Sequence, residues 1–180
     1  MTLHASVTTL LADWSAPDSA QDALRHAVSA FVLGREDACR RSCEPGHITA
    51  SVAVLDQTGR QVLLTLHPRL GRWVQLGGHC EDHDADIDAA ALREATEESG
   101  ITGLQLGPLA AIHVHPLTCS LGVPTRHLDL QFVATAPADA TIAISDESLD
   151  LRWWPVDALP PDSDDSVTSL VAAALALSRG

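Results

Sequence analysis

Apolar residues recur at helical spacing through the first 45 residues of the chain. A first helix is predicted, ended by Pro17, from the apolar face formed by Leu3, Val7, Leu10, Leu11 and Trp14. A second helix is predicted from a capping box at Ser19 and Asp22 to Gly34. We interpret residues 1–45 as a helical extension that packs on the main domain. The alternatives are a homodimer interface and a lid over a substrate.

From His47 onward the apolar positions follow the shorter period of strands. Strands are predicted at 48–55, 61–66, 72–76, 103–114, 126–134, 141–144 and 149–154. One helix is predicted after a cap at Asp84 or Asp86 and runs to Ser99, and a last helix covers 165–178. Strands and helices mix without regular alternation. Residues 46–180 are therefore predicted to form one domain, of the α+β class or an α/β/α sandwich around a mixed sheet.

Composition and charge narrow the classes of partner. With 180 residues, 46% hydrophobic and 19% charged, the chain is long enough for one globular domain with a good core. The formal net charge of −13 argues against a nucleic-acid polymer as partner. The same charge would repel a small phosphorylated substrate unless a divalent metal ion lay between the two.

The expected location is cytoplasmic. Cys39, Cys43, Cys80 and Cys119 form no CxxC pair, which is typical of reduced thiols. No signal peptide is recognised at the N-terminus. The longest uncharged apolar stretch, 167–178, is too short to span a bilayer, so no membrane partner is predicted.

The strongest candidate chemistry is a cluster of acids in one predicted helical turn. Glu94, Glu97 and Glu98 stand at i, i+3 and i+4, so their carboxylates share a face and repel one another. Two of them also lie near the helix end that Gly100 marks, where the helix dipole disfavours negative charge. Oxygen ligands without Cys or His suit Mg²⁺ or Mn²⁺. The alternative is a solvated acidic helix face.

The segment around these glutamates, LGGHCEDHDADIDAAALREATEESGI from Leu76 to Ile101, resembles the Nudix box. The second half of that pattern is matched by Arg93, Glu94, Glu97, Glu98, Gly100 and Ile101, with Ala95 where a bulkier aliphatic residue is usual. In the first half, Gly78 takes the place of the leading glycine and Asp84 that of a glutamate. Eight residues rather than seven then precede Arg93, which indicates an insertion in the loop before the helix.

The resemblance to the Nudix family implies a fold, an activity and roles for particular residues. The fold is a sandwich of the kind predicted above. The activity is Mg²⁺-dependent hydrolysis of a phosphoanhydride in a nucleoside diphosphate linked to another moiety. The family pattern makes Glu97 and Glu98 direct ligands, Glu94 a ligand or base, and Arg93 a residue that orients a glutamate. Gly78 would let a backbone carbonyl approach the metal, and Glu147, in a late loop, is a candidate general base.

Candidate substrate contacts lie outside this segment, and each has a structural alternative. Trp73 could stack on a base or be a core tryptophan. Arg126, His127 and Asp129 could meet phosphate or base, or form a solvent-facing edge, and His79 could border the substrate. A second metal site, for zinc, is permitted by the spacing of four residues: His113, His115, Cys119 and His127. Polar surface histidines are the favoured explanation, because the run lacks a close second pair.

Two rival functions are weighed against the hydrolase. The isopentenyl-diphosphate isomerase branch of the fold has a reactive cysteine where this chain has Gly77, and Cys80 is displaced by three positions. The other rival is a non-catalytic nucleotide-sensing module. It is disfavoured because the glutamate face is complete and no DNA-binding segment is recognised.

Overall fold

The computed structural model describes residues 1–118 and 122–177, which form one seven-stranded mixed sheet with helices on both faces. The strands are β1 (His47–Leu55), β2 (Gln61–His67), β3 (Arg72–Val74), β4 (Leu76–His79), β5 (Gln105–Thr118), β6 (Pro124–Thr135) and β7 (Asp150–Pro155). The described helices are α1 (Leu3–Asp13), α2 (Ser19–Leu33), α3 (Ile87–Ser99) and α4 (Asp165–Leu177).

Strand β1 is the centre of the sheet. It runs parallel to β6 along one edge and antiparallel to β4 and β2 along the other. Strand β5 extends the sheet beyond β6, and β3 and β7 both pair with β2. All nine residues of β1 are buried, as expected for a strand covered on both faces.

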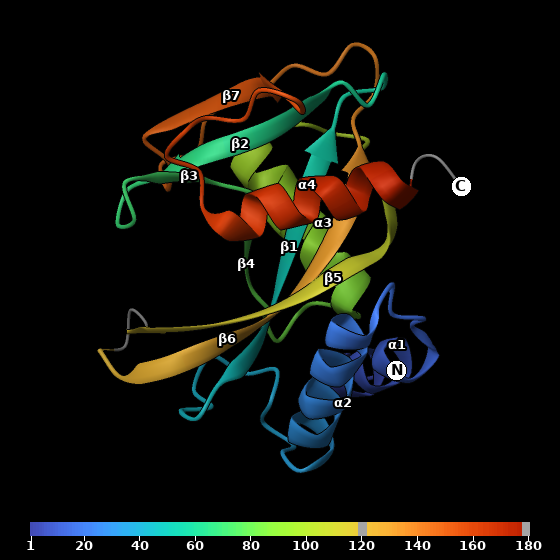
Figure 1. Cartoon of the computed structure of the whole chain (residues 1–180). Coiled ribbons are helices and arrows are strands. Elements are labelled where there is room, and N and C mark those ends of the chain that lie inside the picture. Colours follow the sequence, from blue (N-terminus) through green and yellow to red (C-terminus); the bar gives the residue numbers. More distant parts are fainter. Residues whose placement is uncertain (119–121, 178–180) are drawn as a thin grey trace.

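The helices form two layers around this sheet (Figure 1), with α4 on one face and α3 on the other. Successive residues of β1 point to opposite faces. Val52 and Val54 belong to the core that includes α3, whereas Ala53 and Leu55 pack with α4. This arrangement confirms the predicted α/β/α sandwich.

Helices α1 and α2 contribute to the same core as α3. Val7, Leu11, Val28 and Val32 are almost fully buried and cluster with residues of β1 and α3. The Trp14 indole N–H donates to the Leu109 carbonyl of β5 at 2.9 Å. Helix α2 begins at Ser19 as predicted, but its cap is Asp18, whose carboxylate accepts from the N–H groups of Ala20 and Gln21 at 2.8 Å. The capping-box prediction was therefore wrong by one residue, because Asp18 already fills the acceptor position.

Two predicted elements differ from the structure. Residues 141–144 are not a strand: the Ala143 N–H donates to the Ser99 carbonyl at 2.8 Å, so this segment packs on the open end of α3. The strand predicted at 72–76 is two strands, and the glycine pair belongs to β4. Ser178, predicted as the end of the last helix, lies outside the described residues. Within the described chain, no helix has the length and apolar character needed to cross a membrane.

Candidate functional site

Helix α3 presents the three glutamates on the side of the sheet occupied by α1 and α2. Asp86 caps the helix by accepting from the Ala89 N–H at 2.8 Å, and Gly100 ends it in the left-handed conformation, with φ 69°. Ala91 and Ala95 are fully buried. Such small residues allow a close approach to the sheet, which brings the neighbouring glutamates against strand β4.

Strand β4 contacts two of the glutamates through its glycines. The Gly77 N–H donates to Glu98 Oε2 at 2.8 Å. A Cβ placed on Gly78 would lie 2.6 Å from Glu94 Oε2, so any larger residue would displace that carboxylate. Gly78 is therefore explained by the close approach of the Glu94 carboxylate. Gly77 is explained by its φ of 148° and by the backbone of β1, because a Cβ there would lie 2.5 Å from the Ala50 carbonyl oxygen.

Arg93 connects the helix to the loop before it. Its guanidinium binds both carboxylate oxygens of Asp84, at 2.9 and 3.0 Å, and also reaches Glu94 Oε1 at 2.9 Å and Glu97 Oε2 at 3.1 Å. A further N–H donates to the His79 carbonyl at 2.9 Å. Asp84 lies in the loop before α3, where the extra residue of the motif was predicted, and it still reaches Arg93.

Burial makes two of the carboxylates unusual. Burial raises the pKa of Glu98 to about 8, opposed by the Gly77 N–H and reinforced by the charges of Glu94, Glu147 and Glu97. Burial also raises the pKa of Glu94, although Arg93 opposes it. Ionised carboxylates in such surroundings are destabilising unless a cation compensates them. Hard oxygen donors with unmet negative charge are the donor set that fits Mg²⁺ or Mn²⁺.

Glu97 and Glu147 complete this acidic group on its exposed side. The Glu97 side chain is 61% exposed, against 12% for that of Glu94. Glu147, exposed in the loop before β7, is close enough for its charge to raise the pKa of Glu94 and of Glu98. A loop far away in the sequence thus places a solvent-accessible carboxylate near the turn of α3.

Two predicted substrate contacts lie elsewhere. Trp73 is 7% exposed and packs in the α4 core edge-on to Trp154, with ring centroids 5.2 Å apart. This favours the core interpretation over base stacking. Arg126 is exposed at the start of β6, with its guanidinium 3.5 Å from the Pro45 carbonyl. Its contact with substrate stays a prediction.

Asp129 does not belong to a solvent-facing edge. It is 2% exposed, and its carboxylate accepts from the hydroxyls of Thr49 at 2.8 Å and Ser51 at 2.7 Å and from the Gln131 amide at 3.1 Å. The solvent-edge interpretation was wrong for this residue. The alternating pattern of β6 did not reveal it, because this part of the α4-side face is polar yet buried.

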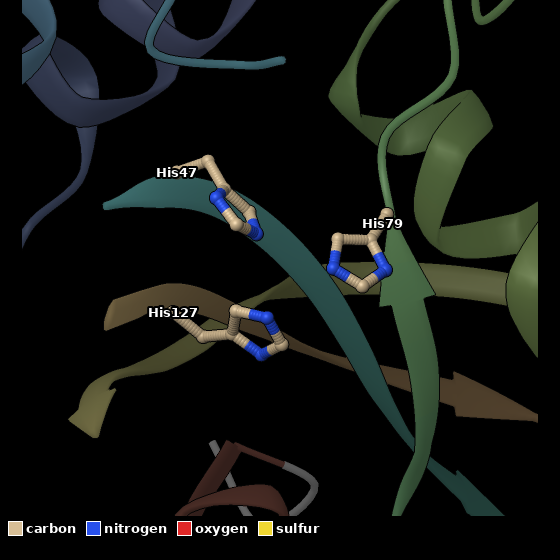
Figure 2. Close-up of side chains that lie close together, drawn as sticks. All are labelled: His47, His79 and His127. Atoms are coloured by element: carbon tan, nitrogen blue, oxygen red, sulfur yellow. The ribbon is translucent and has the colours of Figure 1, made fainter. Parts of the chain in front are cut away.

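The histidines group differently from the sequence prediction. His79 and His127 meet His47, a residue that sequence reasoning had not considered (Figure 2). Of the three described residues whose spacing permitted a zinc site, His127 alone belongs to this group. His113 and His115 stack beside it, with Nδ1 atoms 3.3 Å apart, and Cys119 lies outside the described residues.

Burial lowers the pKa of all three grouped histidines, to about 3 for His127 and about 4 for His79. The nearby charge of Arg41 acts in the same direction. These imidazoles are therefore neutral near pH 7, so each ring has one unprotonated nitrogen. No spacing signal in the sequence could have found the group, because only strand register brings its members together.

The structure resembles solved Nudix structures. A hydrolase of the NUDIX family from Clostridium perfringens is 26% identical, with a TM-score of 0.54, over 74% of this chain and 97% of that one. A Caenorhabditis elegans Ap4A hydrolase is 21% identical, with a TM-score of 0.58, over 74% and 98%. A UDP-X diphosphatase is 14% identical, with a TM-score of 0.58, over 98% and 92%, which includes the N-terminal helices of this chain.

No curated protein sequence matches the chain significantly. The family model of the NUDIX domain, however, matches residues 45–173. That span includes the whole sheet, the glutamate turn of α3 and the loop that contains Glu147. Because the match extends over most of the chain, the protein belongs to the Nudix hydrolase family.

Proposed function

We propose that this protein hydrolyses a phosphoanhydride bond in a nucleoside diphosphate linked to another moiety, with Mg²⁺ held by Glu94, Glu97 and Glu98. Mn²⁺ can replace Mg²⁺ in such an oxygen-ligand site. The observation that carries the proposal is the convergence of three carboxylates in one turn, two of them buried. A divalent cation compensates that charge and attracts a diphosphate to a protein whose net charge is −13.

The residues around the turn have distinct roles in this proposal. Bound Mg²⁺ would neutralise the phosphates and lower the pKa of a water molecule. Glu98 is oriented by the Gly77 N–H and Glu94 by the Arg93 guanidinium. Arg93 is thus a positioning residue, anchored in turn by Asp84. Gly78 leaves room for its backbone carbonyl to serve as a further ligand.

Glu147 is the candidate general base. A base must be accessible to the attacking water and close to the metal-binding carboxylates. Glu147 meets both conditions, since it is exposed and its charge acts on Glu94 and Glu98. In the proposed reaction its carboxylate accepts a proton as water attacks phosphorus.

A substrate panel tests the activity. The solved relatives include an Ap4A hydrolase and a UDP-X diphosphatase, so the panel should contain dinucleoside polyphosphates and UDP-linked compounds. Nucleoside triphosphates, other nucleotide sugars and ADP-ribose complete it. We expect release of a nucleoside monophosphate or phosphate with Mg²⁺ or Mn²⁺, and none with EDTA. Nucleotide binding without release from any compound would support the sensing module instead.

Substitutions test the assigned ligands. Glu97→Gln and Glu98→Gln keep the shape of the side chain but remove its charge, and we expect kcat to fall by about 100-fold or more. Glu36→Gln, the same change at an exposed residue between α2 and β1, is the matched control. Circular dichroism should show all three variants folded. Turnover by Glu97→Gln equal to that of the wild type would remove Glu97 from the mechanism.

A further inference from the structure

Three histidines from three adjacent strands project from one face of the sheet. His47 of β1 is the direct partner of His127 in the parallel ladder with β6. On the other side of β1, His79 of β4 is the partner of Thr49, two residues beyond His47. Paired residues point to the same face, as do residues two apart on one strand. The register therefore places all three imidazoles together on the α4 side.

With this strand register, the three histidine side chains converge. Each ring offers a nitrogen such that the three nitrogens lie within 4.8 Å of one another. The ring centroids are separated by 5.1 Å for His47 and His79, 5.0 Å for His47 and His127, and 4.9 Å for His79 and His127. Figure 2 shows the rings directed toward a common space between the strands.

Two of these rings have buried nitrogens without a hydrogen-bond partner. Nε2 of His47 and Nε2 of His127 are both buried and unpartnered among the described residues. Such atoms are rare in folded proteins and require an explanation. The other nitrogen of His47, Nδ1, lies 3.3 Å from the Cys43 carbonyl. An Nδ1–H bonded to a backbone carbonyl, with Nε2 left as the ligand, is the usual arrangement of a metal-binding histidine.

We propose that His47, His79 and His127 bind one divalent ion of the zinc class through their ring nitrogens. Zinc takes imidazole nitrogens at about 2.0–2.1 Å, so a tetrahedral site needs nitrogens about 3.3 Å apart. The observed spread of up to 4.8 Å requires the rings to close by roughly 1.5 Å, within the range of side-chain rotation. Three protein ligands leave a fourth position open for water or an exogenous ligand.

This site differs in chemistry from the carboxylate turn of α3. Imidazole nitrogens favour zinc and its neighbours, whereas carboxylates favour Mg²⁺ and Mn²⁺. The two sites share β4: the His79 carbonyl accepts from Arg93, and Gly77 and Gly78 contact Glu98 and Glu94. An ion on the three histidines would tie β1, β4 and β6 together at the end of β4.

Arg41 is the charged group that opposes this proposal, since its charge acts on all three histidines. Its side chain is exposed, so solvent and salt screen that charge. The free energy of the imidazole–metal bonds then determines whether the ion binds despite the charge of Arg41.

Cobalt binding tests the site without relying on hydrolysis. Untagged protein treated with EDTA would be titrated with Co²⁺ in excess Mg²⁺, which occupies the carboxylate turn. We expect visible d–d bands of a four-coordinate ion that saturate at one equivalent and vanish when Zn²⁺ displaces Co²⁺. Bands that never form, or that Mg²⁺ abolishes, would overturn the proposal.

Variants and spectra identify the ligands. His127→Ala and His79→Ala should each weaken Co²⁺ binding roughly tenfold or more. His26→Ala, at an exposed position on α2, and His113→Ala should leave it unchanged. Imidazole ¹H–¹⁵N spectra of the wild type should show three histidines shifting on addition of Zn²⁺, a readout that needs no variant to fold. The assignment would be overturned if His127→Ala bound Co²⁺ with unchanged affinity, or if His113→Ala were the one variant that lost Co²⁺ binding.

Discussion

Gly78 shows how one missing side chain makes room for the Glu94 carboxylate. A Cβ at this residue would lie between 2.6 and 2.9 Å from three atoms of the Glu94 carboxyl group. We expect Gly78→Ala to displace that carboxylate and lower kcat roughly tenfold or more, as for loss of a supporting contact. Steady-state kinetics measures this. Gly34→Ala, at the end of α2, is the control because its φ of −84° suits any residue. Unchanged kcat for Gly78→Ala would contradict the role of the close contact.

Arg93 and Asp84 form a pair that is largely buried, with side chains 17% and 2% exposed. Removing Arg93 leaves the buried Asp84 carboxylate without its cation, which costs about 3 kcal/mol in such pairs. Removing Asp84 costs less, because Arg93 still contacts Glu94 and Glu97. We expect a double-mutant cycle of Arg93→Ala and Asp84→Ala to give a coupling energy of about 1–3 kcal/mol in urea unfolding.

The more exposed pair of Arg152 and Asp150, with side chains 62% and 29% exposed, is the comparison, since its atoms are at least as close, at 2.6 Å. Solvent screening limits such pairs to about 0–1 kcal/mol. Equal coupling energies for the two pairs would show that burial adds nothing at Arg93.

The buried histidines predict a pH dependence of stability in the metal-free protein. The pKa of His127 falls from 6.5 to about 3 on folding, so below pH 6.5 the unfolded chain binds a proton that the folded chain does not. Stability is therefore highest above pH 6.5 and falls as the pH drops toward 3. We expect wild type to lose about 1–2 kcal/mol more than His127→Asn between pH 7 and pH 5, measured by urea unfolding in EDTA. Equal losses would show that His127 is protonated in the folded state.

At the scale of elements, α1 and α2 belong to the core that holds α3 in place. Leu11 is fully buried among them, and the Ser6 hydroxyl accepts from the N–H of Ile87 at the start of α3 at 3.0 Å. We expect Leu11→Ala to lower the free energy of unfolding by about 2–5 kcal/mol, the cost of a core cavity.

Leu33→Ala is the control for this change, because Leu33 on α2 is 69% exposed. It should change stability by less than about 0.5 kcal/mol. A similarly small change in stability for Leu11→Ala would mean that the N-terminal helices do not pack against the sheet, as expected for a lid.

The elements also show where a sequence pattern is sufficient to predict secondary structure. Helix α3 carries its own start and end signals in Asp86 and Gly100, and the structure places its limits there. Residues 141–144 have the composition of a strand, yet the Ala143 N–H donates to the Ser99 carbonyl at the end of α3. The difference is physical: capping is local, whereas strand pairing depends on which neighbour is available.

For the whole molecule, net charge predicts how salt affects catalysis. A protein of charge −13 repels an anionic substrate, and salt screens that repulsion. With Mg²⁺ kept saturating, we expect kcat/KM to rise roughly two- to fivefold as ionic strength increases from about 0.01 M to about 0.15 M. Sodium chloride and choline chloride should act alike if screening is the cause. A steady fall in kcat/KM would indicate local attraction that exceeds the overall repulsion.

The sequence by itself determined the features that depend on neighbours along the chain. The turn that carries Glu94, Glu97 and Glu98, the glycines of β4 and the alternation of apolar residues in β6 all follow from local spacing. Those features were sufficient to predict the acidic group on α3 and, together with the resemblance to the Nudix box, the sandwich.

Only the tertiary structure decided which distant residues meet. His47, His79 and His127 come together through the register of β1 with β4 and β6, and Glu147 approaches α3 from a separate loop. The burial of Asp129 likewise depends on partners from β1. The reason is that strand register and loop placement are set by packing across the whole core, which no local pattern encodes.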